Sequence, residues 1–186
     1  MAAYETPYSL DPYNAILPLE RQMLGLLFDR VVEPDENGLR FAIGPLVDSL
    51  SVEDLGREVR LKLRPRQRFS DGGPISGHDV VNTVDLLRLA RGAASDPELV
   101  RYLRGARVNP KDPNEVTIQL HQHPRPESLL TFFVTPSKHL PAPPRPGDPY
   151  SRRPIGSGPF IVPDGADRTT RLIANPMFRD AGAGKP

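Results

Sequence analysis

Apolar residues recur every three or four positions between Pro18 and Val32, and this spacing predicts a helix with one mostly apolar face. A proline suits the first turn of such a helix, and Glu20 suits its positive end. The face consists of Met23, Leu26, Leu27, Arg30 and Val31. Asn37-Gly38 is a typical hairpin dipeptide, and it predicts a short ribbon that joins Val31-Val32 to Leu39–Ile43.

Strict alternation of apolar and polar residues in Arg57–Leu63 predicts a half-buried strand that ends before Pro65. Its inward positions are Val59, Leu61 and Leu63. Six basic residues lie between Arg57 and Arg68 and suggest a phosphate-binding patch. The alternation favours a solvated outer face of the strand instead.

A helix is predicted to begin after Ser76, which can cap it, with Asp79 in its first turn and Gly92 at its end. Its buried stripe is Val80, Val81, Val84 and Leu87. A shorter helix is expected from Asp96-Pro97 to Leu103.

The second half of the chain predicts short elements separated by prolines. Glu115–Leu120 alternates like a strand, and Ser128–Val134 is a buried apolar run. Residues Pro141–Pro154 form a proline-rich surface excursion without regular strand pairing. Phe160–Val162 and Arg171–Ile173 are expected to be a final pair of strands around a polar turn at 164–167.

Composition excludes several classes of protein. The 186 residues carry 24 basic and 23 acidic side chains, and a net charge of +1 is too small for an electrostatic nucleic-acid binder. The absence of cysteine removes disulfides, thiolate catalysis and zinc–cysteine sites. No apolar run approaches the length of a spanning helix, and the first ten residues lack the pattern of a secretory signal.

No residue pattern supports catalysis, a metal site or a cofactor. His121 and His123 would share one face of a strand, but that face carries Thr117 and Gln119 and is expected to be exposed. The stretch 156–159, Gly-Ser-Gly-Pro, has the wrong spacing for a nucleophile elbow or a phosphate loop and predicts a sharp turn. The scattered carboxylates Asp48, Glu53, Asp54, Asp71 and Asp79 suit turns and caps. We therefore expect a protein that is not an enzyme.

Several segments occur in an order that is typical of one family. Leu10-Asp11-Pro12 comes first, followed by the helix that ends Leu27-Phe28-Asp29-Arg30-Val31-Val32. The most specific segment is Phe69–Val81, which reads FSDGGPISGHDVV, and residues 154–160 read PIGSGPF. The last segment is Asn175-Pro176-Met177-Phe178.

This series resembles the amino-terminal part of the family 5 extracellular solute-binding proteins, the peptide- and nickel-binding receptors of ABC importers. The resemblance extends from about Leu10 to Phe178. It implies a mixed α/β fold with α+β character, periplasmic-binding-protein-like of class II, with part of the first lobe and a small accessory subdomain. The implied division is 1–43 for the start of the main ligand-binding lobe, 44–154 for the accessory subdomain, and 155–186 for the return into the main lobe.

Family members are several times longer and close two lobes around a ligand. The resemblance therefore implies an amino-terminal fragment that binds ligand weakly or not at all. In similar proteins the loop after the L-D-P segment lines the cleft. Here the corresponding ligand-binding positions are Tyr13, Asn14, Ile16, Leu17, Pro18, Leu19 and Glu20. Alternatively, Ile16, Leu17 and Leu19 only staple the following helix.

The function implied by the resemblance is an extracytoplasmic receptor of an ABC importer, with a peptide or a solute of similar size as its ligand. Permease subunits are the expected partners, and the membrane is reached only through a removed signal or a lipid anchor. Two alternatives stay open, a ligand-sensing domain of a regulatory protein with the same fold and a receptor for nickel or a metal complex.

Overall fold

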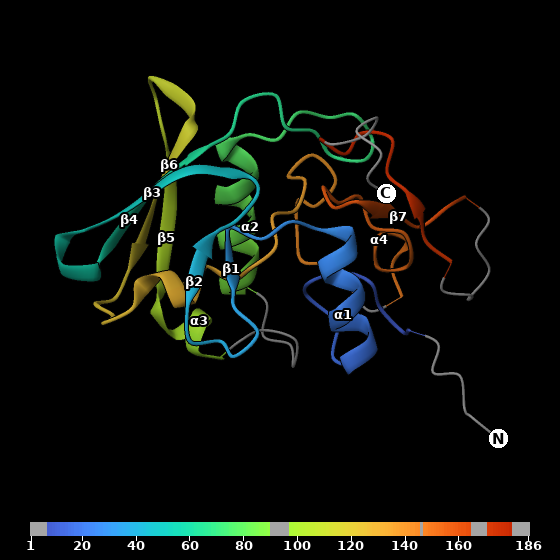
Figure 1. Cartoon of the computed structure of the whole chain (residues 1–186), viewed down its shortest axis with the longest axis horizontal. Coiled ribbons are helices and arrows are strands. Elements are labelled where there is room, and N and C mark those ends of the chain that lie inside the picture. Colours follow the sequence, from blue (N-terminus) through green and yellow to red (C-terminus); the bar gives the residue numbers. More distant parts are fainter. Residues whose placement is uncertain (1–6, 90–96, 146, 165–170, 180–186) are drawn as a thin grey trace.

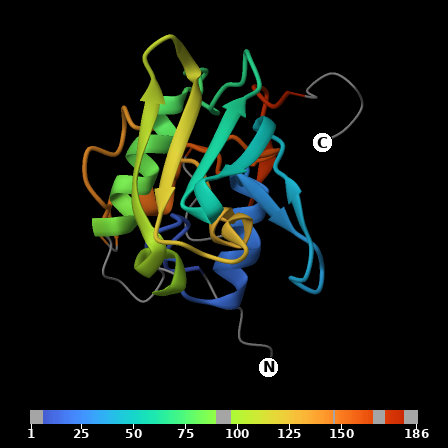
Figure 2. The same cartoon turned by 90° about the vertical axis from the view of Figure 1, so that its left-hand side faces the viewer.

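The computed structural model describes residues 7–89, 97–145, 147–164 and 171–179. Its central element is a four-stranded antiparallel sheet with the strand order β3-β4-β6-β5. The strands are β3 (Val47–Glu53), β4 (Glu58–Leu63), β5 (Leu103–Asn109) and β6 (Asp112–Leu120). Helix α2 (Gly77–Leu89) packs against one face of this sheet, and the other face looks outward (Figures 1 and 2).

Smaller elements surround the sheet and the helix. Strands β1 (Val32–Pro34) and β2 (Phe41–Ile43) form an antiparallel ribbon, and so do β7 (Phe160–Ile161) and β8 (Ile173–Ala174). The helices are α1 (Pro18–Leu27), α3 (Pro97–Tyr102), α4 (Pro149–Arg152), and the 3-10 turns η1 (Asp54–Gly56) and η2 (Pro126–Leu130). Figure 1 shows α1, α4 and β7 at one side of the molecule and the sheet at the other. Within the described residues, no helix has the length and apolarity needed to cross a membrane.

Two hydrophobic clusters hold these parts together. The larger cluster lies between the sheet and α2, where Val59, Val84 and Ile118 are fully buried. The smaller cluster joins α1 to the β7–β8 ribbon and includes Leu24 and Phe28, with Val162 packed against them. At about 25 cal/mol for each Å² of apolar surface removed from water, these clusters are the main source of stability.

The alternating strands and the beginning of α2 after Ser76 confirm the predictions made from periodicity. Val59, Leu61 and Leu63 point inward from β4, and Ser76 precedes α2. The ribbon at Asn37-Gly38 and the pairing of 160–161 with 173–174 are also as predicted. The expected helix end at Gly92 and most of the turn at 164–167 lie outside the described residues.

Helix α1 ends at Leu27, so the predicted extension to Val32 is wrong. Phe28 already has extended backbone angles, and Arg30 pairs with Phe133 in an isolated antiparallel bridge. The helix ends here because another segment takes its last carbonyl groups, and the N–H of Gly158 donates to the carbonyl oxygen of Leu27 at 2.9 Å. Val31 and Val32 then suit an extended backbone because both are β-branched.

Candidate functional site

The loop from Tyr13 to Glu20 is fixed in place at its beginning by buried polar groups. The carboxylate of Asp11 is fully buried and accepts the backbone N–H of Tyr13 at 2.9 Å and that of Asn14 at 3.0 Å. The hydroxyl of Tyr13 lies 2.7 Å from the hydroxyl of Thr135, which lies 3.1 Å from that of Thr83 on α2. Burial raises the pKa of Tyr13, so its phenol stays neutral. This hydroxyl chain ties the loop to the larger cluster.

Glu20 fixes the other end of the loop. Its carboxylate is fully buried at the third position of α1, and it accepts four backbone N–H groups. Tyr8 and Ser9 donate to Oε1 at 2.6 and 2.8 Å, and Ile16 and Leu17 donate to Oε2 at 2.8 and 2.9 Å. Desolvation raises the pKa of Glu20, but these four bonds outweigh it and leave the pKa below its ordinary value.

Between these anchors the loop displays apolar side chains to solvent. Ile16 is 53% exposed and Leu17 is 37% exposed, and Pro18 is exposed as well. Leu19 is half-buried and packs on the smaller cluster, so it fits the stapling role. A rigid loop that holds apolar side chains in water has the form of a preorganised contact surface.

A hollow of about 690 Å³ lies next to the loop, and its size is in the range of small-molecule sites. Asn14 connects the two, because its Nδ2 group donates to the carbonyl oxygen of Pro144 at 2.9 Å. The hollow is lined by the proline-rich segment and includes Tyr150 and Ile155. The sequence analysis treated residues 141–154 only as a surface excursion.

His139 lines one side of the hollow and lies 2.8 Å from Asp71 through Nε2 and Oδ2. Desolvation raises the pKa of Asp71, but bonds from the N–H of Gly73 and from His139 outweigh it and leave that pKa lowered. The pair therefore joins the FSDGGP turn to the segment that forms the hollow.

The two most specific sequence motifs have structural roles. In FSDGGPISGHD, Asp79 accepts the N–H and hydroxyl of Ser76 through Oδ2 and those of Ser137 through Oδ1, all between 2.8 and 3.0 Å. In GSGP, a Cβ atom at Gly156 or Gly158 would collide with the backbone at the end of α1. The close approach of two backbones explains both glycines.

His121 and His123 have different surroundings. His121 is exposed as expected, but the expectation for His123 is wrong, because its residue is only 9% exposed. Its Nδ1 accepts the N–H of Arg125 at 3.1 Å, and its ring contacts that of Tyr102 edge-on at 4.7 Å. Within the part of the chain that the structure describes, no three histidine, aspartate or glutamate residues are placed to hold a metal ion.

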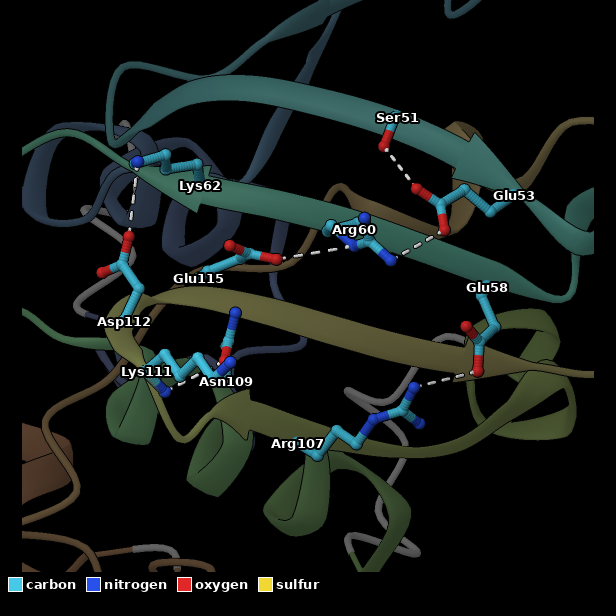
Figure 3. A network of polar contacts seen from close by, with 10 residues as sticks. All are labelled: Ser51, Glu53, Glu58, Arg60, Lys62, Arg107, Asn109, Lys111, Asp112 and Glu115. Carbon is cyan, nitrogen blue, oxygen red and sulfur yellow. Dashed lines mark hydrogen bonds and ion pairs between the residues drawn. The ribbon is translucent and has the colours of Figure 1, made fainter.

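The basic residues of β4 belong to a solvated face, as the alternation indicates. Figure 3 shows this face with its cations beside carboxylates of neighbouring strands. Arg60 lies 3.0 Å from Glu53 and 3.5 Å from Glu115, and Lys62 lies 3.3 Å from Asp112. Because the charges balance across the strands, this face has no excess positive charge for a phosphate.

Comparisons with known proteins show which family and which solved structures this chain resembles. The family described as "Bacterial extracellular solute-binding proteins, family 5 Middle" matches residues 42–186. No curated protein sequence gives a significant match. Among solved structures, MoaA of A. tumefaciens R10 in complex with mannopinic acid has a TM-score of 0.76 and 24% identity over 94% of this chain and 36% of its own.

Two further structures show the same fold. AppA of Bacillus subtilis, an oligopeptide-binding protein in complex with a nonapeptide, has a TM-score of 0.73 and 20% identity over 94% of this chain and 35% of its own. NikZ of Campylobacter jejuni in complex with Ni(L-His) has a TM-score of 0.71 and 18% identity over 92% of this chain and 34% of its own.

The chain spans about a third of the length of these structures. The mixed α/β fold expected from the sequence is confirmed by these neighbours. The family match covers most of the chain, and it agrees with the resemblance carried by the ordered motifs. The chain belongs to the bacterial extracellular solute-binding proteins of family 5.

Proposed function

We propose that the chain is part of the solute receptor of an ABC importer, that it works outside the cytoplasm, and that its ligand is a peptide or a solute of similar size. Family membership supports the class. The observation that carries the proposal further is the loop from Tyr13 to Glu20, which holds Ile16 and Leu17 in water and is bonded through Asn14 to Pro144 in the wall of the hollow. Such a surface provides binding energy without an ordering cost. The proposal includes no catalytic role.

Each predicted cleft residue has a distinct role in this proposal. Ile16, Leu17 and Pro18 contact the solute, because they are exposed at the tip of the loop. Tyr13, Asn14 and Glu20 position the loop, since their polar atoms are already bonded within the protein. Leu19 anchors the loop to α1.

The division of the chain at 43/44 and 154/155 remains a prediction, and the hydrophobic clusters support it. The sheet, α2 and α3 all lie between residues 47 and 120, and they enclose most of the larger cluster. Helix α1 and the β7–β8 ribbon lie outside residues 44–154 and share the smaller cluster. We assign 44–154 to the accessory subdomain and the two flanking segments to the main ligand-binding lobe.

Titration of the isotope-labelled chain with trialanine and with a mixed pentapeptide tests the proposal by NMR. We expect shift changes in backbone amides of residues 13–20 and 139–155. They should disappear in Ile16→Asp, which alters an exposed side chain and leaves both anchors in place. Val52→Asp is the matched control, because Val52 is 46% exposed at the far sheet. Shifts that persist in Ile16→Asp, or shifts confined to amides outside residues 13–20 and 139–155, would contradict the proposed site.

A receptor for a metal complex is the second candidate, because NikZ was solved with Ni(L-His). Addition of the nickel–histidine complex to the same sample separates the two candidates. If the nickel–histidine complex broadens the amide signals of residues 13–20 and the peptides cause no shifts, the metal complex is favoured as the ligand.

A regulatory sensor is distinguished from a transport receptor by the genes around it. Neighbouring permease and ATPase genes would support transport, whereas a regulatory sensor would be joined to a DNA-binding segment.

A further inference from the structure

Among the residues that the structure describes, the partly buried side chain of Arg30 forms no hydrogen bond and no ion pair. Arg30 follows the end of α1, and its backbone forms the isolated bridge with Phe133. Its guanidinium carbon lies 4.6 Å from the centre of the Phe133 ring. The Nε atom is buried and has no hydrogen-bond partner within the described residues. Charged groups that are partly removed from water are usually paired, so a guanidinium without a partner requires an explanation.

The nearest acidic residue in sequence does not neutralise Arg30. Asp29 is buried, and its two carboxylate oxygens accept Arg179 at 2.8 and 3.2 Å in a bidentate pair. Among the residues that the structure describes, no carboxylate lies within 4 Å of the Arg30 guanidinium. The region around residues 29 and 30 therefore contains one balanced ion pair and one uncompensated positive charge.

Within the described residues, neither Nη group of Arg30 forms a hydrogen bond or an ion pair, and the residue as a whole is partly exposed. A guanidinium presents its N–H groups as a planar fork that matches the two oxygens of a carboxylate. The Phe133 ring fixes the plane of that fork, since cations stack on aromatic faces.

We propose that Arg30, supported by Phe133, is a binding subsite for the carboxylate group of a small organic acid or of the carboxyl end of a peptide. The carboxylate would accept both Nη groups and supply the missing negative charge. The subsite goes beyond the proposed receptor function and does not depend on the loop at residues 13–20.

The side-chain Nε–H resonance of Arg30 provides a direct measurement. We expect N-acetylglycine to shift this resonance in a saturable way, and N-acetylglycinamide, which lacks the charge, to leave it unchanged. Trialanine and trialanine amide repeat the comparison for a peptide carboxyl end. A response to N-acetylglycine alone identifies a small-acid subsite, and a response to both free acids identifies a general carboxylate subsite. Either result supports the proposal.

Three variants complete the test. Arg30→Gln should lose the saturable response of the surrounding backbone amides, and Arg30→Lys should weaken it because the fork is lost while the charge remains. Arg101→Gln is the matched control, since Arg101 also lies over an aromatic ring but is exposed. Equal shifts from acid and amide, a retained response in Arg30→Gln, or no response to any free acid would overturn the proposal. A chain that binds no peptide at residues 13–20 can still show the response of Arg30 to a free acid. The experiment therefore distinguishes failure of the proposed receptor function from failure of the Arg30 subsite.

Discussion

Replacement of Glu20 by glutamine tests whether one buried carboxylate fixes the candidate loop. The substitution keeps the size of the side chain and exchanges one oxygen for an NH₂ group. That oxygen accepts two backbone N–H groups, from Tyr8 and Ser9 or from Ile16 and Leu17. Two charge-assisted hydrogen bonds are lost, and the two backbone N–H groups that made them then face the NH₂ group of the glutamine, which is itself a donor.

The size of the effect follows from these contacts. A hydrogen bond to a charged group contributes about 1.5 kcal/mol or more to stability. The loss of two such bonds should therefore lower the free energy of unfolding by about 3 kcal/mol at pH 7. With a urea dependence of about 2 kcal/mol per molar, the midpoint should fall by roughly 1.5 M. Urea unfolding followed by circular dichroism measures this difference.

The pH dependence supplies the second part of the test. The pKa of Glu20 is lowered in the folded state, so its stabilisation is complete above the unfolded pKa and disappears as the pH falls through the folded value. Glutamine does not titrate. The difference between the wild type and Glu20→Gln should therefore narrow as the pH falls below about 4.3, the ordinary value for glutamate.

Glu36→Gln is the matched control, because Glu36 is exposed in the loop between β1 and β2. It should change the free energy of unfolding by less than about 0.5 kcal/mol. If Glu20→Gln at pH 7 stays within about 1 kcal/mol of the wild type, or if the difference does not depend on pH, the reasoning about this carboxylate is refuted.

Three further substitutions test other contacts through the free energy of unfolding in urea. Leu55→Gly should raise it by about 1 kcal/mol, because Leu55 has a φ of 53° at the exposed tip between β3 and β4; a decrease would contradict backbone strain there. Gly158→Ala should lower it by about 2 kcal/mol through collision with α1, whereas Gly105→Ala, with no atom near its added Cβ, should not. Arg179→Met should lower it by about 3 kcal/mol because Asp29 is left buried and unpaired, and an unchanged value would show that the pair contributes little.

Periodicity predicted the elements whose alternation is uninterrupted and missed those with irregular pairing. Strand β4 alternates along its whole length, and β6 alternates in sequence from Glu115 to Leu120, although Thr117 is buried between Val116 and Ile118; both strands were found from the sequence. Strand β3 shifts register between Val47 and Ser49, and β5 shifts between Leu103 and Gly105. A bulge places two residues of one strand opposite a single residue of the neighbouring strand. The residues after the bulge then point to the opposite face from the one that strict alternation predicts. The period of two is therefore interrupted in the sequence, although both strands pair along most of their length in the sheet.

The site residues show a second limit of local patterns. Glu20 was predicted as a residue of the first helical turn, and this position is correct. Two of its four donors come from Tyr8 and Ser9, whose approach depends on the path of the chain before the loop. His123 was predicted to be exposed from the strand alternation, but Tyr102 on α3 covers its ring. In both cases, contacts between segments far apart in the sequence determine the surroundings of the side chain. A local sequence pattern does not reveal such contacts.

The contact between GSGP and the end of α1 also has a consequence for the order of folding. Leu27 and Gly158 are joined by a backbone hydrogen bond across most of the chain length. During synthesis the ribosome releases α1 long before residues 156–158 exist. The carboxyl end of this helix must remain hydrated until then, and contacts of such high sequence separation slow folding. Helix α1 thus reaches its native conformation late, after the β7–β8 ribbon emerges.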